Sequence, residues 1–364
     1  MKRKLRILTA LLACVCMIAA CGENQMDESS DEKTSRDILI SQSELEEETT
    51  STKEIFAMDT YMTVTATGVR SEEAVDAALD EIRRLDVLLS VGNEDSEVYA
   101  INKNGSGALS KDSAALLEKS LWIYETTNGA YDITVYPLME LWGFTGDDPA
   151  LPKDGDISEV LKRCGSDKLS VSDNRLTLGS GQGIDFGGTA KGYTSARIME
   201  IFEEYGMSSG VVSLGGNVQC FRTKPDGSQW RCGITDPENP DDTSSLLGIV
   251  STSNKAVITS GAYERFFVDK ASGKTYHHIM DPKTGYPAES GLTSVTVVSN
   301  DGTLADGLST ACFVMGEKGA VEYWKKYSDQ FDLILMTSDG RLIITEGLKD
   351  SFTSNLDFEV VSNT

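Results

Sequence analysis

The sequence predicts an α+β fold: one domain with a largely antiparallel sheet and flanking helices. Amphipathic helical patterns come early in the chain, whereas β-rich segments separated by turn signals bunch between residues 210 and 346. The regular strand–helix alternation that builds a doubly wound parallel sheet is missing. We find no linker, repeat or low-complexity break after Ile55, so residues 55–364 are expected to form a single domain.

Residues 1–20 have the pattern of an export signal. A basic start is followed by an apolar run, Ile7 to Ala20, that is too short to span a bilayer comfortably. Small residues directly precede Cys21, as in the bacterial lipobox, where the signal is cut before a cysteine that becomes lipidated. Ordinary cleavage beside an incidental cysteine is the alternative. We therefore expect a lipoprotein signal peptide, lipidation of Cys21, and anchoring at the extracytoplasmic face of the bacterial cell membrane.

Residues 21–54 are predicted to form a disordered acidic tether behind the lipid anchor. The segment is rich in Ser, Thr and Glu and has too few apolar residues to offset the entropy of ordering. The whole chain carries a formal net charge of −24. Such a charge disfavours nucleic acid as a partner.

Caps and apolar periodicity predict the helices of the domain. Ser71 is a candidate N-cap for a helix that ends near Leu89, and further helices are expected over 112–127 and 189–205. A fourth helix begins after the turn Asn300-Asp301-Gly302, and another covers 317–327. The predicted strands are 55–66, 210–221, 229–235, 246–252, 255–259, 263–268, 275–280, 292–299, 331–337 and 341–346.

Cys220 and Cys232 flank the turn signal Pro225-Asp226-Gly227. A hairpin at this turn would place the two cysteines opposite each other. Either a disulfide or two small buried residues on paired strands fits this spacing.

Asp306, Ser309 and Thr310 share one face of the predicted helix because they are three and four residues apart. One carboxylate and two hydroxyls form an oxygen-only patch that suits Mg²⁺, whereas no His/Cys cluster has the spacing of a zinc site. A solvated polar helix face is the alternative interpretation.

The stretch from Asp185 to Gly192 reads as the end of a strand and a glycine turn that leads into a helix. Paired glycines let the backbone approach a ligand closely, and the N–H groups there can bind a phosphate. The pattern matches neither a P-loop nor a Rossmann fingerprint. A tight structural turn explains the glycines equally well.

His277 and His278 are the two histidines of the chain. Strand alternation sends them to opposite faces and places His278 on the face of Met280, just before a turn that begins at Asp281. An imidazole there could take a proton from an attacking hydroxyl. A structural histidine is the alternative.

Eight ordered stretches between Phe56 and about Tyr327 resemble the ApbE family of FAD:protein FMN transferases. They are FAMDT, SEVYAIN, NGAYDITVYPL, IDFGGTAKGY, SLGGN, ITSGAYERFF, HHIMDPKTGYP and ADGLSTACFVMG. The resemblance implies an α+β enzyme that binds FAD and Mg²⁺. It implies transfer of FMN to a threonine hydroxyl of a target protein, with release of AMP.

The resemblance also implies roles for individual residues. FAD would contact Met58, Tyr99, Ala130, Tyr131, Asp132, Asp185, Lys191 and Met280, several of them through the backbone. The metal would be held by the Gly188 carbonyl with Asp306, Ser309 and Thr310. Several relatives have a second carboxylate at the position of Ser309, and some have an acid at that of Lys191. His278, with Asp281 beside it, becomes the candidate for activating the acceptor hydroxyl.

The implied partner is a flavin-acceptor protein with the motif Asp-Gly-x-Ser/Thr-small-Thr, either an Rnf- or Nqr-type subunit or an extracellular flavoprotein. Residues 306–311 are similar to this motif but lack its final threonine, so self-modification is not expected as the main role. Two other functions stay open. The same site could hydrolyse FAD to FMN and AMP, or the lipoprotein could bind flavin without catalysis.

Overall fold

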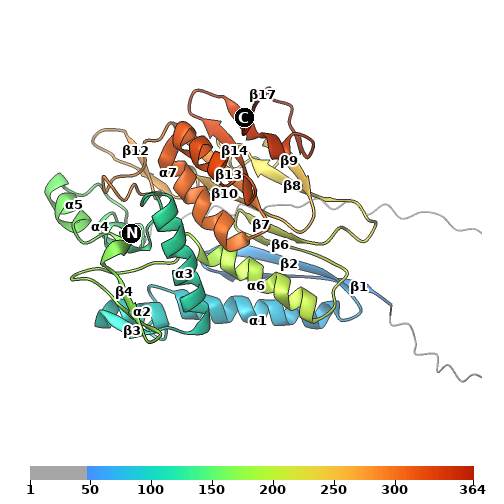
Figure 1. Ribbon diagram of the computed structural model, residues 1–364, viewed down its shortest axis with the longest axis horizontal. Helices are drawn as coiled ribbons and strands as arrows, with labels where there is room; N and C mark the ends of the chain where they lie inside the picture. The colour runs from blue at the N-terminus through green and yellow to red at the C-terminus, as the bar shows by residue number, and fades with distance from the viewer. Residues whose placement is uncertain (1–46) are drawn as a thin grey trace, which may run out of the picture.

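The computed structural model describes residues 47–364 (Figure 1). The predicted signal peptide, the lipidation site Cys21 and most of the predicted tether therefore lie outside the described residues. Within residues 47–364, none of the helices combines the length and the apolar character needed to cross a bilayer.

A nine-stranded sheet forms the centre of the fold, and all its neighbouring strands run antiparallel except the last pair, β15 and β17. This architecture confirms the predicted α+β class. The strands in sheet order are β1 (Thr49–Ala57), β2 (Thr60–Gly68), β6 (Ser209–Leu214), β7 (Asn217–Phe221), β10 (Ala256–Gly261), β13 (Leu292–Ser299), β14 (Phe331–Thr337), β15 (Leu342–Thr345) and β17 (Phe358–Val361).

Helices cover one face of this sheet (Figure 1). Both α6 and α7 pack on the strands, while α1 packs on α6 and the β1–β2 hairpin, and α3 packs on α7. The helices are α1 (Ser71–Leu89), α2 (Glu97–Asn104), α3 (Lys111–Thr126), α4 (Tyr136–Leu141), α5 (Asp154–Leu161), α6 (Ala190–Glu204) and α7 (Gly302–Lys326).

A three-stranded sheet covers the other face of the central sheet. Its strands are β16 (Phe352–Thr353), β9 (Leu246–Thr252) and β8 (Trp230–Thr235). Successive residues of β14 show the layering, because Leu333 and Leu335 join the core under the helices while Ile334 and Met336 join the core under the small sheet. Both faces of β14 are therefore buried, which explains why the strand is apolar throughout rather than alternating.

Two segments that were each predicted to form one strand form two strands joined by a turn. The segment 55–66 turns at Met58 and Asp59, whose φ angles of 47° and 59° give the left-handed two-residue turn that joins antiparallel strands. The first strand of this hairpin begins at Thr49, so the prediction that the disordered tether continues to residue 54 is wrong. Likewise, 210–221 divides at Gly215 and Gly216, both with positive φ.

Other boundaries also differ from the predictions. Ser71 is the first helical residue of α1 rather than its cap, and its hydroxyl pairs with Thr49 at 2.9 Å. The strand predicted over 275–280 ends at His277; this strand, β12 (Thr275–His277), pairs with β11 (Phe266–Val268). We did not predict α2, α4, α5 or the small sheet of β3 (Ser106–Ala108), β5 (Arg175–Thr177) and β4 (Ser170–Ser172).

The helices at the centre of the domain agree closely with prediction. The observed α3 and α6 lie within about one residue of their predicted ranges. A kink at Gly316, with φ 72° and ψ 175°, divides α7 into the two helices that the sequence predicts there. Asp301 caps α7 by accepting the N–H of Leu304.

Candidate active site

A cavity of about 390 Å³ opens where the helices meet the ends of the strands. Its walls come from segments far apart in the sequence: the β1–β2 turn, the end of α1, the loop before α4, the glycine turn before α6, the start of β7, the residues after β10, the loop after β12 and the first turns of α7. The cavity therefore forms only when the whole domain has folded.

Most of the predicted site residues line this cavity. They are Met58, Ala130, Tyr131, Asp132, Asp185, Gly188, Lys191, His278, Met280, Asp306 and Thr310. Asp132 is held by other protein groups, since its carboxylate accepts hydrogen bonds from the Thr134 amide and from the Ser166 hydroxyl. Any contact that Asp132 makes with a ligand would therefore involve its backbone more readily than its side chain.

Three predicted site residues do not line the cavity. The hydroxyl of Tyr99, on α2, lies 3.4 Å from Glu94. Ser309 is fully buried, and its hydroxyl donates to the Asp306 carbonyl at 2.7 Å. The Asp281 carboxylate accepts the Lys283 amide hydrogen at 2.9 Å within its own turn. In this geometry Thr310 and Asp306, rather than Ser309, present the polar face of α7.

Close helix packing holds Asp306 at the glycine turn. Gly192 of α6 donates its amide hydrogen to Asp306 Oδ2 at 2.8 Å. A Cβ atom at position 192 would lie 2.2 Å from the Gly302 carbonyl oxygen and 2.6 Å from Asp306 Cβ. Only glycine therefore lets α6 approach α7 closely enough for this hydrogen bond.

The cavity concentrates acidic groups whose ionisation is disfavoured. Burial raises the pKa of Asp306 to about 6, against the charge of Lys191 and the amide of Gly192. Burial likewise raises the pKa of Asp185, although its carboxylate accepts the Gly187 amide hydrogen. Raised carboxyl pKa values indicate that the protein alone supplies too little positive charge here.

The donor atoms fit a hard cation such as Mg²⁺. Asp306 and Thr310 are one helical turn apart, and a Cβ atom on Gly188 would lie 3.7 Å from Thr310 Oγ1, so these three residues converge. No group of three or more His, Cys, Asp or Glu residues with metal-binding geometry occurs in residues 47–364. Mg²⁺ needs no such cage, because it keeps several waters and binds ligand phosphates.

A buried amide faces the same space. Asn217 at the start of β7 is 3% exposed and lines the cavity. Its side-chain amide interacts with Asp306 and opposes the rise of the Asp306 pKa, but no acceptor lies at full hydrogen-bond geometry to Nδ2 among the described residues.

The two histidines have different surroundings. The His277 ring contacts Phe313, and its Nε2 lies 3.1 Å from the Ala288 carbonyl, which indicates a structural role. His278 lines the cavity with Nδ1 3.2 Å from the Arg265 carbonyl oxygen. Since Nδ1 must donate to that oxygen, Nε2 carries the lone pair. Burial, followed by the charge of Arg265, lowers the pKa of His278 to about 3, so the ring is neutral.

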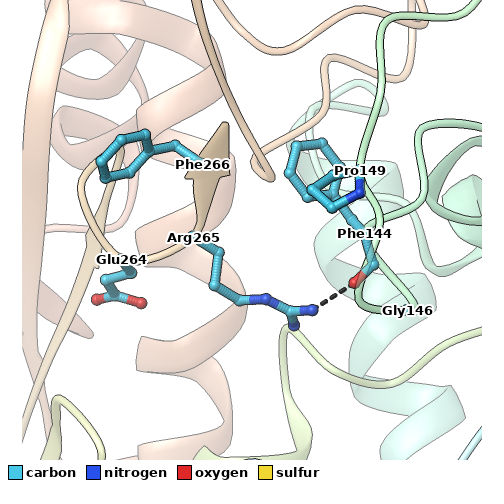
Figure 2. A pocket seen from close by; sticks show the side chains of 6 residues that line it. All are labelled: Phe144, Gly146, Pro149, Glu264, Arg265 and Phe266. Carbon is cyan, nitrogen blue, oxygen red and sulfur yellow. Dashed lines mark hydrogen bonds between the residues drawn. The ribbon is translucent and has the colours of Figure 1, made fainter. Parts of the chain in front are cut away.

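Glu264 and Arg265 lie at the site without having been predicted. They line both the main cavity and an adjoining pocket of about 260 Å³ that is also bordered by Phe144, Pro149 and Phe266 (Figure 2). The Arg265 guanidinium donates to the Phe144 carbonyl and fixes the loop after α4 against this segment. The only sequence signal was their place inside the stretch ITSGAYERFF, which assigns neither residue a role.

One cavity is lined by oxygen donors for a cation, the buried Asn217 amide, two basic side chains and a neutral imidazole. This combination defines a class: α+β enzymes that act on a phosphorylated ligand.

Comparison with known proteins narrows the class. Residues 58–335 match the sequence profile described as the ApbE family. The FAD:protein FMN transferase of Treponema pallidum is 30% identical over 305 residues, which cover 77% of this chain and 83% of that protein. The corresponding protein of Haemophilus influenzae is 29% identical over 289 residues, or 76% and 82% of the two chains. The chain belongs to the ApbE family.

Solved structures agree with this assignment. The crystal structure of the ApbE protein from Thermotoga maritima has a TM-score of 0.77 and 32% identity, and covers 83% of this chain and 99% of its own. The apo form of the flavinyl transferase ApbE of Pseudomonas stutzeri has a TM-score of 0.74 and 26% sequence identity. The match covers 85% of this chain and 98% of that protein. Both TM-scores show that these two proteins have the same overall fold as this chain.

Proposed function

We propose that this protein transfers FMN from FAD to a threonine hydroxyl of an acceptor protein, in a Mg²⁺-dependent reaction that releases AMP. One observation supports the proposal above all: in a member of the ApbE family, Gly188, Asp306, Thr310 and His278 all line one cavity. The family match supports flavin chemistry. The donor set and the neutral imidazole support phosphoryl transfer to an alcohol.

Each residue of the site has a separate role in the proposed transfer. Gly188, Asp306 and Thr310 would hold Mg²⁺, which when bound neutralises charge on the FAD diphosphate. Lys191 adds a positive charge beside Asp306 and Glu264. His278 Nε2 accepts the proton of the threonine hydroxyl as its oxygen bonds to the FMN phosphorus. The bond from that phosphorus to the bridging oxygen breaks, and AMP leaves with the bridging oxygen.

The buried Asn217 amide and the backbone of the glycine turn would orient the diphosphate. The Asn217 amide lies beside Asp306 in the cavity, and Gly187 and Gly188 keep the turn free of side-chain bulk. Fixed donors of this kind stabilise a transferring phosphoryl group without having to reorganise.

The acceptor and the location form part of the same proposal. The acceptor would carry the motif Asp-Gly-x-Ser/Thr-small-Thr, as in an Rnf- or Nqr-type subunit or an extracellular flavoprotein. Lipidation at Cys21 would anchor the enzyme to the extracytoplasmic face of the cell membrane, a proposal supported by the lipobox pattern alone.

Intact-mass measurement tests the reaction. The protein is incubated with FAD, Mg²⁺ and an acceptor domain carrying the motif, beside a control acceptor whose final threonine is replaced by alanine. We expect the first acceptor alone to gain the mass of an FMN group, with one AMP released per adduct. Free FMN and AMP with neither acceptor modified would contradict transfer and identify a hydrolase. Flavin binding without turnover would contradict both activities.

A further inference from the structure

Two buried thiols contact each other between the sheets, outside the cavity. Cys220 on β7 is 1% exposed and Cys232 on β8 is 5% exposed, with 3.6 Å between the two Sγ atoms. Their strands do not pair with each other: β7 pairs with β6 and β10, whereas β8 pairs with β9. The predicted hairpin arrangement is therefore wrong, and the contact crosses the core between two layers.

We propose that Cys220 and Cys232 are an oxidative modification site that forms a disulfide linking the three-stranded sheet to the nine-stranded sheet. The sulfur atoms are already in contact, so reaching the bonded S–S distance requires each to move by less than about 1 Å. The proposal requires this displacement to come from rotation of the two side chains, with the strands staying in place. No function proposed above uses either thiol.

Local chemistry favours this pair over the other described cysteines. Cys164 contacts the Val160 carbonyl at 3.9 Å, and Cys312 is fully buried in α7. Burial raises the pKa of Cys164 to about 12 and raises the pKa of Cys312 as well. In contrast, the hydrogen bond from Cys220 lowers the pKa of Cys232, which makes Cys232 the better nucleophile.

The oxidant is a low-molecular-weight disulfide such as glutathione disulfide. The Cys232 thiolate attacks one glutathione sulfur, forms a mixed disulfide and releases the first glutathione thiolate. Cys220, on losing its proton, attacks the Cys232 sulfur and releases the second. Two cysteine thiols are oxidised, one glutathione disulfide is reduced to two thiols, and the two cysteine protons end on the glutathione sulfurs.

The connection between the cysteines provides a route for the reagent. Residues 225–229 are exposed and form a turn in which the Lys224 amide donates to the Ser228 carbonyl at 2.9 Å. Opening of this surface turn would uncover Cys232 while the central sheet stays paired. Surface turns of this kind open at much lower cost than core strands.

Peptide mapping tests the cross-link directly in the purified full-length chain. Trypsin cleaves after Arg222 and Arg231, so Cys220 and Cys232 fall into separate peptides, 198–222 and 232–255. After equilibration of the native protein with glutathione disulfide and alkylation of remaining thiols, we expect these peptides to be joined and to separate on reduction. Recovery of both as alkylated or glutathionylated single peptides would overturn the proposal, as would a link that forms only in urea.

Thermal denaturation gives a second, independent readout. Since the cysteines are twelve residues apart, the oxidised protein should have a Tm roughly 5 °C above that of the reduced protein. Cys232→Ala should abolish this difference, whereas Cys312→Ala, which removes a lone buried thiol, should retain it. A Tm difference that persists in Cys232→Ala would contradict the cross-link as its cause. If Cys232→Ala does not fold, the mapping of the natural chain still decides.

Discussion

Replacing Asp306 by asparagine should make the protein more stable in the absence of Mg²⁺. Asp306 is 6% exposed, and burial raises its pKa from 3.8 to about 6. A shift of about two units corresponds to about 3 kcal/mol of unfavourable free energy for the ionised group at pH 7.5. Asparagine is neutral, keeps the shape of the side chain and can still accept the Gly192 amide hydrogen. We therefore expect a gain of about 2–3 kcal/mol.

The raised pKa of Asp306 also predicts how the stability of the natural protein changes with pH. Because the folded-state pKa of Asp306 is raised, the unfolded chain loses its proton first as the pH rises. Stability from this group is present below about pH 4 and is lost as the pH passes about 6. Asp306→Asn removes this loss, so the stability difference between variant and natural protein should grow from pH 4 to pH 7.

Mg²⁺ should reverse the order of stability. At one thousand times its dissociation constant, bound cation stabilises the natural protein by about 4.1 kcal/mol, which exceeds the advantage of the variant, and the asparagine variant should gain much less from Mg²⁺. Urea unfolding at pH 7.5, followed by tryptophan fluorescence with EDTA or with Mg²⁺, measures both quantities. Asp332→Asn is the control, since Asp332 is a buried carboxyl with a raised pKa that does not line the cavity. It should leave the Mg²⁺ response intact.

Two outcomes would refute this reasoning. If Asp306→Asn is less stable than the natural protein at pH 7.5 with EDTA, the carboxylate is not an uncompensated buried charge. If the variant keeps the full Mg²⁺ response, Asp306 is not a ligand, and the proposed position of the cation is wrong.

Three further predictions address the base, the helix packing and the anchor. His278→Gln should lower the rate of FMN transfer at least 100-fold with little change in Tm, whereas Asp281→Asn should change it less than about threefold; equal losses in both variants would contradict the assignment of the base. Gly192→Ala should lower the free energy of unfolding by about 1–3 kcal/mol in urea, because its Cβ would clash with Gly302, and an unchanged value would contradict the close helix approach. Cys21→Ser should move the protein from the membrane fraction to the supernatant and abolish labelling by palmitate; retention in the membrane would refute lipid anchoring.

Sequence patterns predicted where helices and strands occur more accurately than they predicted the residues at which these elements begin and end. Apolar periodicity and glycine stops are local signals, so α3 and α6 could be predicted closely. The β1–β2 turn was missed because Met58 and Asp59 adopt left-handed angles that sequence reasoning expects of Asn-Gly or Asp-Gly. Tertiary packing on both sides stabilises this turn, including a hydrogen bond from the Met58 amide to Asp86 at 3.0 Å.

For the candidate site, too, local sequence patterns predicted positions along the chain but not the contacts made in the folded protein. Helical spacing correctly placed Asp306 and Thr310 on one side of α7, but it could not reveal that Ser309 is fully buried, with its hydroxyl 2.7 Å from that of the cavity residue Ser260. His278 lines the cavity as expected, although the strand used to orient it ends one residue earlier. Glu264 gave no local signal, because its significance depends on segments that only the folded chain brings near it.

The parallel strand β17 has a consequence for protein production. Phe358–Val361 lies beyond the region that matches the family, yet it pairs with β15 and covers one border of the large sheet. Asn363 fastens the segment by hydrogen bonds to Glu346 and Ser328. Shortening the gene at the end of the family match would cut β14 and remove β15 together with β17, which would leave an apolar strand edge open to other molecules and favour aggregation. Expression should therefore retain the C-terminal residues, with any affinity tag placed after Thr364.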